Sequence, residues 1–173
     1  RDAQDKAQQA RPLSRDDTVD PEKLWEWMAA YEKKTGGKVL AIPHNGNLSN
    51  GRMFEETTFT GGPLTKGYAE ARQKWEPLYE VTQIKGQSES QPSLSPEDEF
   101  ASWDLWDRGN LNGNAKTPGM YRTEYWREAL KSGLRLEAAL GANPFKYGAN
   151  GATDTHTGLS TADDDNFWGK FKT

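Results

Sequence analysis

The chain of 173 residues contains no cysteine, and its β-branched aliphatic residues number only two Ile and three Val. The absence of cysteine excludes disulfide bonds, thiolate metal sites and cysteine nucleophiles. Parallel sheets and barrel interiors are filled largely by β-branched residues, and a closed α/β barrel takes about 250 residues. The composition therefore excludes a complete, self-sufficient α/β barrel, and we expect one part of a larger fold.

Long apolar runs and clusters of basic residues are also missing. No stretch approaches the ~18 apolar residues of a membrane span, and residues 1–19 lack the apolar core of a signal peptide. The net charge is −4. Phosphate binding requires concentrated Lys and Arg, so we expect neither nucleic acid nor a membrane as a partner.

Aromatic residues are abundant instead, with seven Trp, six Tyr and six Phe. Each can bury about 150–250 Å², so aromatic rings can replace the missing aliphatic core. The chain also has 17 Gly and 9 Pro. These features together predict a loop-rich α/β protein with an aromatic core.

The chain divides into a polar linker or arm over residues 1–19 and a single domain portion over 20–173. A helix is expected from residue 21 to about 35, because Asp20 is a good N-cap, Pro21 suits the first helical position and Gly36 ends it. Leu24, Trp27, Met28 and Tyr31 would form its buried face. The apolar run 38–42 then predicts a strand buried on both faces, followed by a long loop over 45–63.

Periodicity predicts the remaining elements: helices over 66–75, 119–132 and 136–140, and strands over 78–84 and 145–149. A helix that feeds a buried strand is the αβ half of a βαβ unit, in which ligands bind at the carboxyl ends of the strands. His44 stands at such an end. Glu80 lies in the middle of the strand 78–84, where it either serves the site or pairs with a basic residue across the sheet.

Only two histidines occur, and each follows a predicted strand. Asp154 and His156 are two residues apart, so in extended backbone their side chains point the same way from backbone positions ~6.6 Å apart. A metal between them would take one oxygen and one nitrogen ligand, and His44 would supply the third ligand of a catalytic zinc pattern. The structural alternative is that Asp154 caps a turn, that His156 is an exposed residue and that the Asn-Gly after His44 is only a turn signal.

Three segments together resemble a known family: VLAIPHNGN (39–47), LYEV (78–81) and TDTHTG (153–158). They are similar to the later motifs of PHP-type (polymerase and histidinol phosphatase) metal-dependent hydrolases, an amidohydrolase-related group. The wider sequence, including QIKGQSE (83–89), is closer still to a large bacterial domain-of-unknown-function family grouped with those hydrolases.

The resemblance implies a distorted (βα)7, TIM-like barrel with two or three divalent ions (zinc, manganese or iron) at the carboxyl ends of the strands. It assigns His44, Asp154 and His156 as metal ligands. It places Glu80, Asn45 and Asn47 around the metals or at the substrate. The His-x-His strand of that family is absent here, so a missing N-terminal segment or a second chain would complete the fold, and this fragment alone would be inactive.

The sequence thus predicts the carboxyl-terminal part of a metallohydrolase that acts on a small-molecule substrate, of phosphoester type. One alternative is a non-catalytic module that binds a glycan or a protein through its Trp-rich loops. Another is a metal-free hydrolase. The resemblance slightly favours a secreted or periplasmic location over the cytoplasm.

Overall fold

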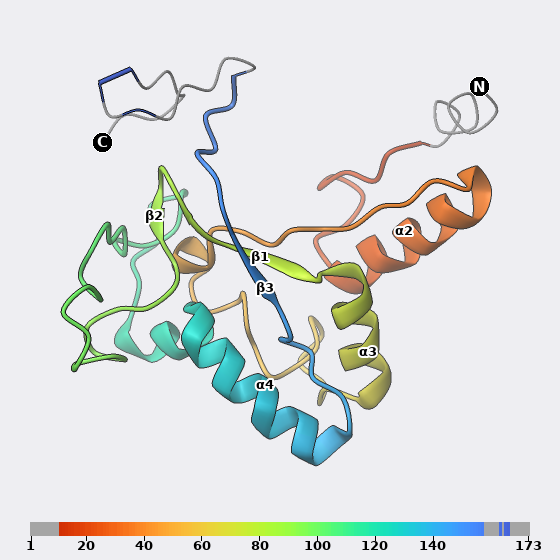
Figure 1. The fold of residues 1–173 in the computed structure, drawn as a ribbon. Coiled ribbons are helices and arrows are strands. Elements are labelled where there is room, and N and C mark those ends of the chain that lie inside the picture. The colour runs from red at the N-terminus through yellow and green to blue at the C-terminus, as the bar shows by residue number, and fades with distance from the viewer. Residues whose placement is uncertain (1–10, 158–162, 164, 167–173) are drawn as a thin grey trace.

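The computed structural model describes residues 11–157, 163, 165 and 166, which form a mixed α/β structure (Figure 1). Its elements are α2 (Pro21–Thr35), the 3-10 helix η1 (Gly46–Leu48), α3 (Lys66–Trp75), β1 (Leu78–Gln83), β2 (Gly86–Gln87), the 3-10 helix η2 (Pro118–Thr123), α4 (Trp126–Leu140) and β3 (Gly148–Gly151). The sheet has the order β2-β1-β3, with β1 antiparallel to β2 and parallel to β3. The predicted α/β class is confirmed, and the barrel stays a prediction.

Helix α2 begins and ends where its capping residues predicted. The Asp20 carboxylate accepts a hydrogen bond from the Glu22 amide at 3.0 Å, Pro21 occupies the first turn, and Gly36 closes the helix at φ 74°. Trp25 and Met28 are its buried apolar residues. The predicted face therefore included Met28 correctly but omitted Trp25, whose indole donates to the buried Glu76 carboxylate at 2.9 Å.

The segment 38–43 is not the strand that its apolar run predicted. One hydrogen bond, from the Ala41 amide to the Trp75 carbonyl at 2.8 Å, joins it to the end of α3, and another, from the Glu80 amide to the Pro43 carbonyl at 3.0 Å, joins it to β1. Leu40 and Ile42 are 52% and 36% exposed. The prediction of burial on both faces is therefore wrong, and Pro43 has no amide hydrogen with which to extend a ladder.

Strand β1 is irregular part of the way along. The register with β3 shifts between Glu80 and Thr82, as in a β-bulge. On the edge away from β3, Pro43 accepts the Glu80 amide before the shift, and Val81 accepts the Ser88 amide at 2.7 Å after it. Segment 38–43, β1 and β3 run in one direction, and their carboxyl ends lie at the same edge of the sheet (Figure 1).

Helix α4 is continuous where two helices were predicted. Gly133 lies in its interior, and a Cβ atom there would meet the Asn143 amide oxygen at 2.3 Å, so this glycine permits the close approach of the following loop. The predicted strand over 145–149 is shifted to β3, because Phe145 and Tyr147 are buried in the core before the strand begins.

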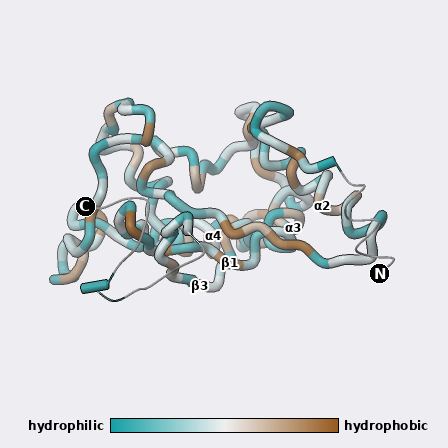
Figure 2. Tube along the Cα trace, turned by 90° about the horizontal axis from the view of Figure 1, so that it is seen from above, coloured by the Kyte–Doolittle hydropathy of each residue, from teal (hydrophilic) through white to brown (hydrophobic). Residues whose placement is uncertain are grey.

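The aromatic core is confirmed. Phe54 packs edge-on against Tyr79 and Phe145, with ring centroids 5.0 and 5.7 Å apart. The same cluster takes residues from α2, α3 and α4, so the three helices share one core with the sheet. Figure 2 shows hydrophobic segments in the middle of the molecule and further ones in the outlying loops. Within the part of the chain that the structure describes, none of the helices is long and apolar enough to cross a membrane.

Candidate functional site

The candidate site lies where the three parallel segments end. His44 and Asn45 follow segment 38–43, Lys85 follows β1, and Asp154 follows β3. The Ile84 amide donates to the Thr153 carbonyl, with an N···O distance of 3.4 Å, so the chain leaving β3 stays beside the chain leaving β1. The chain segments that leave β1 and β3 therefore lie side by side at one edge of the sheet.

Asp154 is the centre of this cluster. Its Oδ1 lies 2.7 Å from Nε2 of His156. Its Oδ2 accepts hydrogen bonds from Nε2 of Gln83 at 3.1 Å and from Nζ of Lys85. The Lys85 side chain is almost wholly buried and the Asp154 side chain is 21% exposed. One carboxylate oxygen is thus held by the protein interior, while the other faces the imidazole.

The backbone at the site adopts conformations that non-glycine residues rarely take. Asp154, His156 and Asn45 have φ values of 50°, 57° and 60°. The expectation of extended backbone at Asp154 and His156 is therefore wrong, although their side chains do meet. Left-handed residues of this kind cost about 1–3 kcal/mol each and cluster at functional sites.

His44 is exposed, and its ring is turned toward its own backbone. Nδ1 donates to the Ile42 carbonyl at 3.1 Å, so in the neutral imidazole Nε2 is the nitrogen without a hydrogen. The neighbouring Asn45 is linked to Asp154 through Gln83, because the Asn45 Oδ1 atom accepts from the same Gln83 amide nitrogen at 2.5 Å. Within residues 11–157, 163, 165 and 166, no three His, Asp or Glu side chains are grouped closely enough to hold a metal ion.

Asn47 holds the backbone beside the candidate site. Its buried side chain donates to the Lys85 carbonyl at 3.0 Å and to the Trp106 carbonyl at 2.9 Å. Both amide hydrogens are therefore used within the protein. Asn47 fixes the backbone that carries Lys85 and so acts on Asp154 indirectly.

Glu80 sits in β1 opposite Asn150 of β3. Its Oε1 atom is buried and has no hydrogen-bond partner among the described residues. No cross-sheet ion pair of Glu80 occurs in that part of the chain either, so the predicted structural alternative of a Lys or Arg partner finds no support there. A buried carboxylate oxygen without a partner is costly unless a group outside these residues satisfies it.

Sequence reasoning missed Gln83 and Lys85, the two side chains that hold Asp154. Gln83 did carry a signal, because the period of the strand places it on the same inward face as the buried Tyr79. Lys85 carried none, since its burial depends on the turn into Gly86, where φ is 88°.

A buried ion pair contacts the loop that follows His44, and the sequence analysis did not predict this pair. Lys116 and Glu124 lie 3.0 Å apart with side chains almost fully buried. Burial raises the pKa of the Glu124 carboxyl, and the ammonium group of Lys116 opposes that rise. Lys116 also donates to the Asn47 carbonyl at 2.6 Å, and Glu124 accepts the Gly51 amide at 3.0 Å, so the pair fixes the loop that follows His44.

Comparison with known proteins identifies a family for this chain. Neither the curated proteins nor the solved structures returned a match to this chain. A family model described as "Protein of unknown function (DUF3604)" matches residues 1–173. The chain therefore belongs to the DUF3604 family.

Proposed function

We propose that this chain is the carboxyl-terminal part of a PHP-like metal-dependent hydrolase, in which Asp154, His156 and His44 hold a divalent ion. The observation that carries the proposal is the contact between Asp154 and His156 at the carboxyl ends of parallel segments. Ligand sites in α/β folds occur at this edge. The DUF3604 family match is compatible with the proposal and does not by itself indicate a function.

The environment of Asp154 fits the role of a metal ligand. Ligating carboxylates are oriented by hydrogen bonds from surrounding groups, and here Gln83 and Lys85 both bind Oδ2. Oδ1 then remains on the side of His156, where an ion would replace the direct contact between the two side chains. An oxygen and a nitrogen donor together suit zinc, manganese or iron.

The hydrogen bond of His44 fits the same role. Metal-ligating histidines donate their other ring N–H to a carbonyl or carboxylate, which fixes the tautomer. The bond from Nδ1 to the Ile42 carbonyl does this and leaves Nε2 as the ligand atom. The contacts from Asn45 through Gln83 to Asp154 connect the backbone next to His44 with the other two ligands.

Such an ion, when bound, would lower the pKa of a water molecule toward ~7 and polarise the bond to be cleaved. The residues of this chain orient the ligands: Lys85 and Gln83 hold Asp154, and Asn47 holds the backbone of Lys85. We assign the substrate to the small phosphoesters. The remaining ligands would come from polypeptide outside these 173 residues, as would full hydrolytic activity.

The proposal is tested by titrating the chain with Zn²⁺ and Mn²⁺ in a calorimeter. We expect one ion to bind per chain, and Asp154→Asn to weaken binding by about 10–100-fold, since even changes around metal ligands have effects of that size. Asp16→Asn is the matched control, because Asp16 is an exposed carboxylate far from the site in sequence. It should bind the ion as the unmodified chain does.

Equal binding by the Asp154→Asn and Asp16→Asn variants would contradict the proposal. The contact between Asp154 and His156 would then be an ordinary turn contact. In the longer protein, hydrolysis that persists in the presence of a chelator would instead support the metal-free alternative.

A further inference from the structure

Two large aromatic side chains project into solvent from the loop that follows β2. Phe100 is 70% exposed and Trp103 is 75% exposed. Neither belongs to the aromatic core or to the candidate metal site. Rings of this size would bury a large apolar area if a ligand or a partner covered them.

Both rings border one groove of about 490 Å³. Polar side chains also line it, namely Thr82, Gln87, Glu89, Ser90, Asp98 and Arg127, together with Ala101. The size falls within the ~300–1,000 Å³ range of small-ligand sites. A second hollow of about 590 Å³ shares Asp98, Phe100 and Arg127, so the ligand surface extends beyond the first groove.

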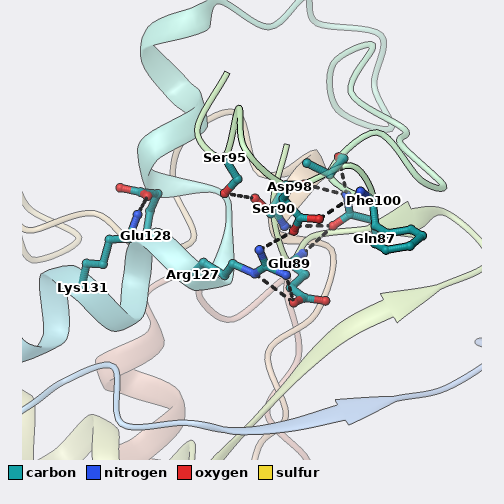
Figure 3. A network of polar contacts seen from close by, with 10 residues as sticks. Gln87, Glu89, Ser90, Ser95, Asp98, Phe100, Arg127, Glu128 and Lys131 are labelled. Atoms are coloured by element: carbon teal, nitrogen blue, oxygen red, sulfur yellow. Dashed lines mark hydrogen bonds and ion pairs between the residues drawn. The ribbon is translucent and has the colours of Figure 1, made fainter. Parts of the chain in front are cut away.

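The polar side chains of the groove are held by the protein in advance (Figure 3). The side-chain Oε1 atom of Gln87 accepts hydrogen bonds from the backbone amides of Glu89 and Ser90 at 2.7 and 3.0 Å, and its Nε2 atom donates to the Ser90 backbone carbonyl at 2.6 Å. The Asp98 carboxylate accepts the Phe100 amide at 2.9 Å. A ligand would therefore meet an ordered wall with a low entropic cost of binding.

Arg127 fixes the two carboxylates (Figure 3). It donates to one oxygen of Glu89 at 2.7 and 2.9 Å and to one oxygen of Asp98 at 2.6 Å. In the part of the chain described, Oε2 of Glu89 takes no hydrogen bond. The groove thus offers oriented carboxylate acceptors as well as two exposed rings, with a formal charge of −1 from Glu89, Asp98 and Arg127.

This chemistry selects the ligand. Phosphates and other anions would be repelled by the two carboxylates. The core of a protein interface is depleted of charged residues, whereas Glu89, Asp98 and Arg127 line this groove together with the rings. Sugars match both features, because their C–H faces stack on aromatic rings and their hydroxyl groups donate to carboxylates and amides.

We propose that this groove binds a neutral oligosaccharide, with Phe100 and Trp103 as stacking platforms and Glu89 and Asp98 as hydroxyl acceptors. The binding does not depend on the proposed metal site. It assigns to this face of the molecule a recognition role that is separate from hydrolysis.

The test is calorimetric titration of the chain with glucose-, xylose- and mannose-based hexasaccharides, with a chelator present throughout. At least one should bind, and its binding should shift the Trp fluorescence to shorter wavelength. Trp103→Ala should weaken that binding about tenfold or more, while Trp103→Phe should keep much of it. Leu134→Ala is the matched control, because Leu134 is also an exposed apolar residue, at 67%, but lies on α4.

Failure of all three hexasaccharides to bind at millimolar concentration would overturn the proposal. Binding that is unchanged in Trp103→Ala would do so as well. Self-association of the chain that is lost in Trp103→Ala would show that the rings form a protein interface instead. Since the chelator removes divalent ions, none of these results bears on the metal proposal.

Discussion

At the scale of single residues, the site depends on amide side chains that each donate two hydrogen bonds. Gln83 binds both Asn45 and Asp154 through one amide nitrogen, and Asn47 binds two carbonyls through another. The spacing of Asp154 and His156 predicted side chains that point the same way from extended backbone, whereas the structure brings the two side chains into direct contact from left-handed backbone. Such left-handed residues depend on the surrounding tertiary contacts, which a local pattern does not contain.

Gly46 gives a prediction at this scale. Its amide donates to the Tyr79 hydroxyl at 3.0 Å, and a Cβ atom would lie 2.2 Å from that hydroxyl oxygen and 2.3 Å from the Glu124 carbonyl oxygen. Backbone and a buried ring cannot move away cheaply, so Gly46→Ala should lower the free energy of unfolding by about 3 kcal/mol. Urea denaturation measures this change.

Gly119→Ala is the control for Gly46→Ala. No atom lies within 4 Å of a Cβ atom built at Gly119, which belongs to η2. Its effect should stay within about 0.5 kcal/mol. Equal stability of the two variants would show that the loop after His44 packs less tightly than the structure indicates.

At the scale of elements, capping residues and periodicity predicted the helices whose ends are determined by local interactions. The caps of α2 and the bounds of α3 were predicted from capping and periodicity and are confirmed. The strand predicted over 38–42 and the break predicted in α4 were both wrong. Pro43 limits the pairing of the first, and contact with Asn143 accommodates Gly133 within the second.

The attachment of α4 to the loop 51–57 gives a pH prediction. Burial alone would raise the pKa of Glu56, but hydrogen bonds from Arg135 and Ser132 outweigh it and hold that pKa below the ordinary value of 4.5. The folded state therefore binds the proton more weakly than the unfolded state. The resulting stabilisation is present above pH 4.5 and is lost as the pH falls through the lowered pKa.

Glu56→Gln should accordingly lose less stability than the unmodified chain between about pH 6 and pH 3, because it has no carboxylate to protonate. Thermal unfolding at a series of pH values measures the difference. Glu97→Gln, at an exposed carboxylate, should follow the unmodified chain. Parallel curves for Glu56→Gln and the unmodified chain would contradict this account of Glu56.

At the scale of the whole molecule, composition predicted the aromatic core, because the chain has little else to bury. It also predicted a mixed α/β structure with long loops. The sheet of the described residues has three strands, and the barrel remains a prediction that rests on resemblance. The face that carries Phe100 and Trp103 could be anticipated from the Trp-rich loops only as one alternative, because exposure depends on how the loop after β2 folds.

The central claim is that the carboxyl ends of the parallel segments form a metal site. The most direct measurement is anomalous scattering from crystals of the chain grown with Zn²⁺. We predict a peak about 2.0–2.2 Å from both Oδ1 of Asp154 and Nε2 of His156. A Zn²⁺ peak elsewhere, or an intact contact between the Asp154 and His156 side chains in the presence of Zn²⁺, would contradict the account.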